Sequence, residues 1–156
     1  MSAAHAGAVD RVVRACLGAD APRVVRALPV SGGSISRAWR AHLDDGSICF
    51  VKTHDGTDAD ALFAGEAAGL DALAAADLRV PRGAVAAPAG ARPAGIVMEA
   101  IDTGPLTDAV FARLGAALAA MHRRTAGARF GFDRDNHIGA TPQPNGWCDV
   151  GWCFHR

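Results

Sequence analysis

The residues best suited to chemistry in this 156-residue sequence lie in one stretch, which begins with a glycine turn and ends at Lys52. Lys52 directly follows an apolar run. Glycine lets backbone N–H groups approach phosphate oxygens closely, and a lysine adds a positive point charge beside the same oxygens. The pattern predicts a clamp for nucleotide phosphates, formed by Gly32, Gly33, Ser34 and Lys52.

A simpler interpretation fits the same stretch. The turn lacks the third glycine of a G-x-G-x-x-G motif, and its lysine does not follow the glycines directly as in a Walker loop. An ordinary β-hairpin with a lysine that extends from the strand end toward water would have similar residues. The stretch alone leaves both interpretations open.

Strands on both sides of a tight turn are expected to position Lys52. The runs 35–43 and 47–51 have strand composition, and the Asp-Asp-Gly sequence at 44–46 is typical of a hairpin turn, because Asp and Gly tolerate positive φ. The β-branched run 23–30 predicts another strand, which enters the glycine turn. Lys52 is therefore expected at the end of the second hairpin strand.

Glu66 is the residue expected to face Lys52. It lies in a predicted helix over 61–76, three residues after Phe63 and four before Leu70, so it shares their apolar face. A carboxylate on such a face is costly unless it meets a cation, and Lys52 also leaves an apolar run. We predict a Lys52–Glu66 ion pair; the alternative is a glutamate that turns to water at the helix edge.

The strand predicted over 94–101 ends at an Asp-Thr-Gly-Pro breaker. If the clamp binds a nucleotide, the backbone from Glu99 to Ile101 is placed to bind the adenine edge. Met98 would then line the pocket behind the base. A central strand without any ligand explains the same residues.

The remaining segments predict packing elements and one long loop. Residues 8–18 predict an amphipathic helix closed by a glycine, and Asp58 or Asp60 is a candidate cap for the helix over 61–76. Residues 107–124 predict a second long helix capped by Thr107. Residues 127–149 predict a functional loop rich in Gly, Pro, Asn and Asp. The apolar stripe of the second helix, expected in the core, is Phe111, Leu114, Leu118 and Met121.

Neither candidate metal motif is complete. The acidic cluster at 133–137 lacks the distal glutamate of a calcium loop. Cys148 and Cys153, with His155 nearby, do not provide four zinc ligands at suitable spacing. The sequence therefore predicts no metal site and free thiols.

The amino-acid composition indicates the cellular compartment and limits the classes of binding partner. With 16 basic and 16 acidic residues the formal net charge is zero, which favours neither nucleic acid nor a membrane surface as a partner. The four cysteines are scattered, as in proteins of a reducing compartment. No signal peptide and no apolar run of about 20 residues is evident. These features predict a cytoplasmic protein.

Several segments resemble the fructosamine kinase family, a branch of the kinase-like fold that includes the aminoglycoside phosphotransferases. The matching segments are SGGSISRAWR, FVK, FAGEAAGLDAL and, above all, LAAMHRRTAGARFGFDRDNHIGATPQPNGW. The resemblance implies phosphorylation of a sugar hydroxyl on fructosamine or ribulosamine adducts of small molecules or proteins, with ATP and magnesium. It implies that Lys52 contacts the ATP phosphates, that Glu66 holds Lys52, that Gly32 and Gly33 form the phosphate turn, and that Met98 to Ile101 form the hinge.

The resemblance also implies a fold class and its parts. An α+β kinase-like N-lobe, an antiparallel sheet with a helix, is expected over 23–101 after an N-terminal helix within 1–22. Residues 102–156 would begin a helical C-lobe with a helix over 107–124 and a substrate-side loop over 127–149. This C-lobe would be incomplete.

The sequence departs from the family pattern in its catalytic residues. The family's His-Gly-Asp motif with its catalytic Asp, and the later magnesium-binding Asp, are not found. We therefore expect no catalytic residue and no magnesium ligand in this chain, and no turnover by the chain alone. The alternatives are a non-catalytic nucleotide- or protein-binding remnant and a phosphotransferase for another small alcohol such as an aminoglycoside. An incomplete lobe would expose apolar surface and favour self-association.

Overall fold

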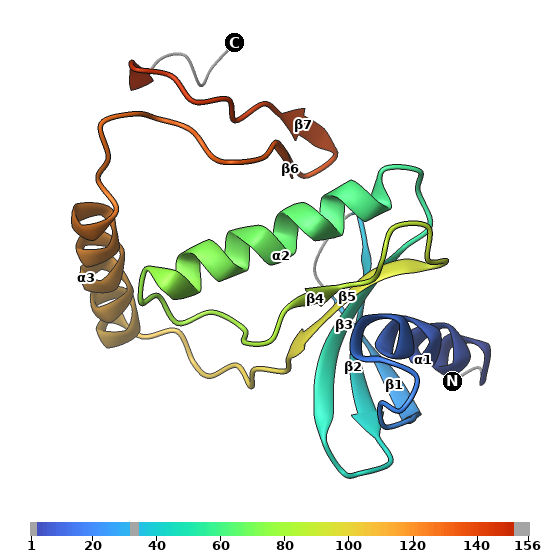
Figure 1. Ribbon diagram of the computed structural model, residues 1–156. Helices are drawn as coiled ribbons and strands as arrows, with labels where there is room; N and C mark the ends of the chain where they lie inside the picture. Colours follow the sequence, from blue (N-terminus) through green and yellow to red (C-terminus); the bar gives the residue numbers. More distant parts are fainter. Residues whose placement is uncertain (1–2, 32–34, 152–156) are drawn as a thin grey trace.

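The computed structural model describes residues 3–31 and 35–151, and it has an α+β architecture (Figure 1). The larger sheet is antiparallel, with the strand order β1-β2-β3-β5-β4, and the smaller sheet is a β6–β7 hairpin. No helix in these two ranges is long and apolar enough to cross a membrane. The elements are α1 (Ala3–Leu17), β1 (Val24–Val30), β2 (Arg37–Leu43), β3 (Ile48–His54), α2 (Ala59–Ala75), β4 (Val85–Ala86), β5 (Ala94–Glu99), α3 (Asp108–Arg124), β6 (Asn136–Ile138) and β7 (Thr141–Gln143).

Helix α1 covers one face of the larger sheet. Val9, Val12 and Val13 recur at helical spacing and are almost fully buried. They pack against sheet residues that include Trp39 and Val51. Burial of this apolar surface is the main force that holds α1 on the sheet. The helix predicted within 8–18 is therefore confirmed, with an earlier start.

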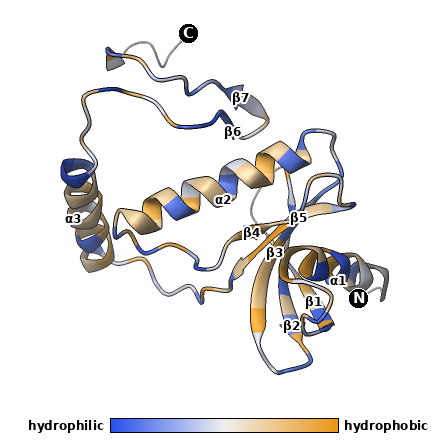
Figure 2. Ribbon diagram, viewed as in Figure 1, coloured by the Kyte–Doolittle hydropathy of each residue, from blue (hydrophilic) through white to orange (hydrophobic). Residues whose placement is uncertain are grey.

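Helix α2 covers the opposite face of the same sheet. Phe63 is 1% exposed and packs with Ile96 and Met98 of β5. Side chains alternate between the faces of a strand, so β5 sends Val97 to the α1 side and its two neighbours to the α2 side. Figure 2 shows the apolar residues along these strands. Lys52 is paired in register with Ile96 and so faces α2.

The hairpin prediction is confirmed and its second strand is longer than expected. Gly46 has a φ of 84°, and the Asp45 carboxylate accepts hydrogen bonds from the backbone N–H and the hydroxyl of Ser47. The strand β3 continues to His54 because its last residues pair with the start of β5. Lys52 therefore lies inside the strand, and its predicted place at the strand end is wrong.

Helix α3 forms as predicted, but the predicted burial of its apolar stripe is wrong. Thr107 caps the helix, since its Oγ1 accepts a hydrogen bond of 3.3 Å from the Val110 N–H. No residue of α3 is buried, and Phe111 and Leu114 are 56% and 47% exposed. The 3.6-residue period indicates that a helix has an apolar face, but it does not specify what covers that face.

The segment 127–149 is more ordered than a loop, so that prediction is wrong in part. It contains the β6–β7 hairpin, whose turn includes Gly139 with a φ of 64°. A separate bridge pairs Phe130 with Cys148. The strands have only three residues each, and the Gly, Pro and Asn around them gave the sequence a loop composition.

Candidate functional site

Lys52 and Glu66 form the ion pair that the sequence predicts. The Lys52 Nζ atom lies 2.6 Å from Glu66 Oε1 and donates a hydrogen bond to it. The two side chains are 31% and 27% exposed. A charge-assisted hydrogen bond in partly buried surroundings is stronger than one at an open surface. The pair therefore holds the lysine amine at a fixed place between β3 and α2.

The two elements place these side chains by their own periodicity. On β3, Lys52 follows Phe50 on the same face, and Phe50 packs against the core beneath α2. On α2, Glu66 lies one turn after the buried Phe63. Lys52 and Glu66 thus lie at the edge of the same apolar contact between β3 and α2, where their side chains meet.

A cavity of about 550 Å³ opens beside the pair. Lys52 and Glu66 lie in its wall, and the rest of the wall comes from the start of β2, from α2 and from the β6–β7 hairpin. Most of this wall is apolar, with a few polar groups that converge, as is typical of small-molecule sites. The other lining residues are Ile35, Ser36, Ala38, Leu62, Gly65, Gly69, Leu70, Leu73, Asn136, His137 and Gly139.

Gly32, Gly33 and Ser34, the predicted phosphate turn, lie outside the described residues. The residues that follow them, Ile35 and Ser36, line the cavity next to Lys52. The chain on the C-terminal side of the predicted turn therefore contributes to the same cavity wall as Lys52.

Met98 and Glu99 end β5 and Ile101 lies two residues past it; none of these three predicted hinge residues lines this cavity. Met98 is 5% exposed and is paired with Phe50, two residues before Lys52. The Glu99 N–H donates a 2.9 Å hydrogen bond to the Arg82 carbonyl and is thereby occupied. Ile101, past the strand, is 42% exposed.

The Glu99 side chain has an ion pair that sequence reasoning missed. Arg79 donates two hydrogen bonds to its carboxylate at 2.8 and 2.9 Å, and the Arg82 N–H adds a third at 3.0 Å. The Arg79 hydrogen bonds are the main reason that the pKa of Glu99 is lowered. This network ties the segment before β4 to the end of β5.

A second missed ion pair joins β2 to the segment after β5. Arg40 Nη1 lies 2.8 Å from Asp102 Oδ1. Arg40 is paired in register with Phe50 and so lies on the same sheet face as Lys52. Nothing in the sequence spacing indicates this contact, since it depends on the register of β2 against β3.

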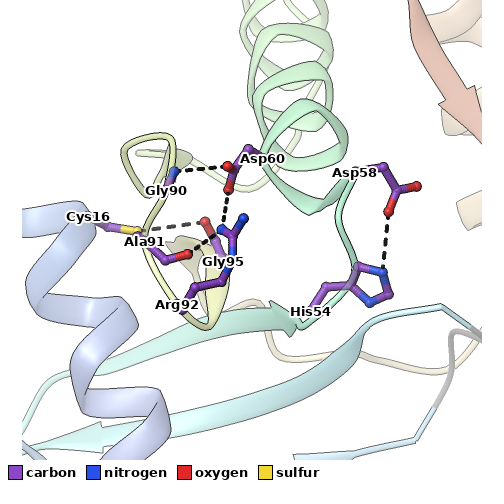
Figure 3. Close-up of polar contacts among 8 residues, drawn as sticks. All are labelled: Cys16, His54, Asp58, Asp60, Gly90, Ala91, Arg92 and Gly95. Atoms are coloured by element: carbon purple, nitrogen blue, oxygen red, sulfur yellow. Dashed lines mark hydrogen bonds and ion pairs between the residues drawn. The ribbon is translucent and has the colours of Figure 1, made fainter.

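The start of α2 is fixed differently from the prediction (Figure 3). Asp58 occupies the N-cap position, but its side chain makes no capping hydrogen bond and lies 3.8 Å from His54. Asp60 accepts hydrogen bonds from the Gly90 N–H at 2.9 Å and from Arg92 at 3.0 Å. Asp58 is thus the predicted N-cap residue, but its side chain does not cap the helix. Asp60 instead ties α2 to the turn before β5, and the Gly90 hydrogen bond is the main cause of its lowered pKa.

The carboxylates of the acidic cluster make structural hydrogen bonds. Asp133 accepts one from the Trp147 indole at 3.1 Å, and Asp135 accepts one from the Asn145 N–H at 2.8 Å. Across residues 3–31 and 35–151, His, Cys, Asp and Glu side chains form no group of three or more that could hold a metal ion.

An antiparallel sheet with a helix on its face, and a strand lysine paired with a helix glutamate, characterise the kinase-like fold. The solved structure of a candidate fructosamine-3-kinase from Haemophilus somnus 129PT superposes with a TM-score of 0.76 at 21% identity, covering 95% of this chain and 49% of that one. A second one, from Thermobifida fusca, gives 0.61 at 31% identity, covering 90% and 45%. The expected α+β kinase-like fold is therefore confirmed.

The sequence profile of fructosamine kinases matches residues 8–156, so this chain belongs to the fructosamine kinase family. It is 37% identical over 128 residues to the probable ketoamine kinase slr1563 of Synechocystis, covering 81% of this chain and 42% of that protein. It is 40% identical over 132 residues to the chloroplastic protein-ribulosamine 3-kinase of Arabidopsis thaliana, covering 81% and 39%. The matched part is thus less than half the length of either relative.

Proposed function

We propose that this chain forms the nucleotide-binding part of a kinase that transfers phosphate from ATP to a sugar hydroxyl of a ketosamine. The Lys52–Glu66 pair at the cavity wall is the observation that carries the proposal. The names of the relatives, ketoamine kinase and ribulosamine 3-kinase, support the acceptor class. Residues 23–101 are proposed as the nucleotide lobe and residues 102–156 as part of the acceptor lobe.

Lys52 fits the phosphates of ATP. Its amine is fixed by one carboxylate and keeps donors free, since an ammonium group has three. Glu66 orients the amine, and the apolar wall of the cavity lowers the local dielectric, which strengthens its attraction for phosphate oxygens. The backbone from Glu99 to Ile101, apart from the occupied Glu99 N–H, is proposed to bind the base outside this cavity, with Met98 behind the base. Gly32, Gly33 and Ser34 are proposed to bind the phosphates.

For magnesium, no comparable site is proposed within residues 3–31 and 35–151. The described residues offer no cluster of carboxylates near Lys52, and the sequence lacks the His-Gly-Asp motif of the family. Phosphoryl transfer depends on positioned metal ions and a residue that orients the acceptor hydroxyl. We therefore expect the 156 residues to bind nucleotide without turning over.

Amine labelling tests the phosphate role of Lys52 directly. Lys52 is the one lysine of the sequence, so an acylating reagent modifies it and the N-terminal amine alone. Bound ATP is expected to slow acylation of Lys52 and to leave the N-terminus unaffected. Peptide mass spectrometry separates the two sites. Equal acylation of Lys52 with and without saturating ATP would contradict the proposal.

Calorimetric titration with Mg·ATP measures how much the proposed contact between Lys52 and the phosphates contributes to nucleotide affinity. The Lys52→Ala variant is expected to bind about tenfold or more weakly, because a charge-assisted contact to phosphate is lost. Arg113→Ala removes an exposed cation of α3 and serves as the matched control with unchanged affinity. A Lys52→Ala variant that binds as tightly as the parent chain would overturn the assignment.

A release assay for ADP tests the expected lack of turnover. The chain is incubated with Mg·ATP and a ribulosamine- or fructosamine-bearing amine, and we expect no ADP above background. Turnover at kinase rates, about 1–100 per second, would show that the missing motif has a substitute within these residues. Binding of an aminoglycoside but not of a ketosamine would favour the other acceptor class.

A further inference from the structure

The β6–β7 hairpin lies directly against α2 (Figure 1). Gly65 of α2 lies at this contact, and it immediately precedes Glu66. A Cβ atom added at Gly65 would lie 3.4 Å from Asn136 Cβ and 3.7 Å from Asn136 Cα. The hairpin backbone therefore packs on α2 next to the glutamate that holds Lys52.

Asn145 fixes the hairpin in this place. It is 3% exposed, and its side-chain Nδ2 donates hydrogen bonds to the Arg134 carbonyl at 3.1 Å and to Asn136 Oδ1 at 2.9 Å. Its backbone N–H donates to Asp135 Oδ1 at 2.8 Å, and its carbonyl accepts from the Phe132 N–H at 2.8 Å. Buried polar groups with this many partners strongly restrict the backbone that carries them.

The contact between hairpin and helix has a second component. Arg134, held by Asn145 through its carbonyl, directs its guanidinium to the Ala64 carbonyl of α2 at 3.4 Å. His137 follows Asn136 on β6 and lines the cavity together with Lys52 and Glu66. A shift of the hairpin would thus change both the support of α2 and the wall of the cavity.

We propose that Asn145 is a positioning residue for the nucleotide clamp. It holds β6 on Gly65, and β6 in turn prevents α2 from moving away from the sheet and carrying Glu66 out of reach of Lys52. The consequence for nucleotide affinity rests on the proposed function, but the restraint of α2 does not.

Hydrogen exchange tests the restraint without nucleotide. In Asn145→Ala, the backbone amides of α2 are expected to exchange about tenfold faster, while those of α1 keep their parent rates. Asp149→Asn is the matched control, because it removes the exposed 2.9 Å ion pair with Arg129 in the same segment. Unchanged exchange in α2, or equal acceleration in α1 and α2, would overturn the inference.

Nucleotide affinity tests whether the restraint acts through the pair. Residues that share one network show non-additive effects, so Asn145→Ala is expected to weaken Mg·ATP binding about tenfold in the parent chain and less than twofold in Glu66→Gln. The same loss in both backgrounds would contradict a role through Glu66. If Lys52→Ala leaves binding unchanged, the proposed function fails, and hydrogen exchange still decides the restraint.

A second variant covers the case in which Asn145→Ala does not fold. Gly65→Leu leaves the hydrogen bonds of Asn145 unaltered but pushes the hairpin from α2, and the same faster exchange of the α2 amides is expected. Because Gly65 also lines the cavity, exchange without nucleotide is the only readout for this variant. Gly115→Leu is its control, since no atom lies within 4 Å of a Cβ at that helical glycine. Parent-like exchange of α2 in Gly65→Leu would show that the contact is dispensable.

Discussion

Gly95 of β5 lies so close to Val12 of α1 that no other residue fits its place. A Cβ atom at Gly95 would overlap the Val12 side chain and lie 2.6 Å from the Lys52 carbonyl. Val12 is fully buried, and the Lys52 carbonyl belongs to β3, the central strand, so neither neighbour has room to move. This glycine therefore sets the distance between α1 and β5, the strand that pairs with the one carrying Lys52.

Gly95→Ala is accordingly expected to destabilise the fold. Overpacking of a filled core costs about 1–3 kcal/mol, and the backbone contact here places the cost at the upper end. Urea unfolding followed by circular dichroism measures it. Gly69→Ala on α2, where a Cβ meets nothing within 4 Å, is expected to raise stability by up to about 1 kcal/mol. Equal stability of the two variants would contradict the packing argument.

The Lys52–Glu66 pair should contribute modestly to stability. Loss of a partner from a buried pair costs about 3–5 kcal/mol, but these side chains are almost one third exposed, so we expect about 1–2 kcal/mol for Glu66→Ala. The double variant Lys52→Met, Glu66→Leu should recover most of that loss, because no charge is left without a partner. A thermal melt compares the three chains; a double variant less stable than Glu66→Ala would refute this.

The cysteines should differ in reactivity. Burial raises the pKa of Cys16 from 9.0 to about 11, and burial also raises the pKa of Cys49. Since the thiolate is the reactive form, both should alkylate much more slowly at pH 8 than Cys148, which is only half-buried. Peptide-resolved mass spectrometry after iodoacetamide treatment gives the three rates. Faster modification of Cys16 than of Cys148 would contradict the burial.

The raised pKa of Cys16 also predicts a direction for alkaline stability. The folded state holds the thiol proton more tightly than the unfolded state, so this contribution is complete below about pH 9 and is lost as pH rises toward 11. Cys16→Ala should therefore flatten the fall of the melting temperature between these values. An identical fall in both chains would show that other groups cause it.

Glu99 predicts the opposite pH dependence. Its pKa is lowered below 4.5, mainly by Arg79, so the folded state favours the charged form. The contribution is present above about pH 4.5 and is lost as pH falls below the lowered pKa. Glu99→Gln should reduce the loss of melting temperature on acidification from pH 5 to pH 3. A Glu99→Gln chain that loses as much melting temperature as the parent over this range would contradict this role of Glu99.

The exposed apolar face of α3 is expected to cause self-association. Leu106, Phe111 and Leu114 are 76%, 56% and 47% exposed and lie on or next to this helix. Apolar surface of this kind favours association in water. Light scattering should give a mean mass that rises with concentration, and Phe111→Glu with Leu114→Glu should return it to the monomer. A parent chain that is monomeric at all concentrations would contradict this expectation.

The sequence by itself determined the Lys52–Glu66 pair. Both residues interrupt apolar patterns, and the periods of a strand and a helix place each of them at the edge of the same core. The hairpin turn and the Thr107 cap followed from local residue types, and the kinase-like class followed from segments that resemble the fructosamine kinase family. The errors in these local predictions are small: β3 runs a few residues past its predicted end, and the Asp58 side chain does not cap α2.

Only the tertiary structure decided which distant residues meet. The Arg40–Asp102 pair depends on strand register, and the hydrogen bonds of Asn145 depend on a short hairpin hidden in loop-like composition. The apolar stripe of α3 had the period of a core helix, yet it is exposed. A local pattern specifies which face of an element is apolar, but its partner is selected by the packing of the whole chain.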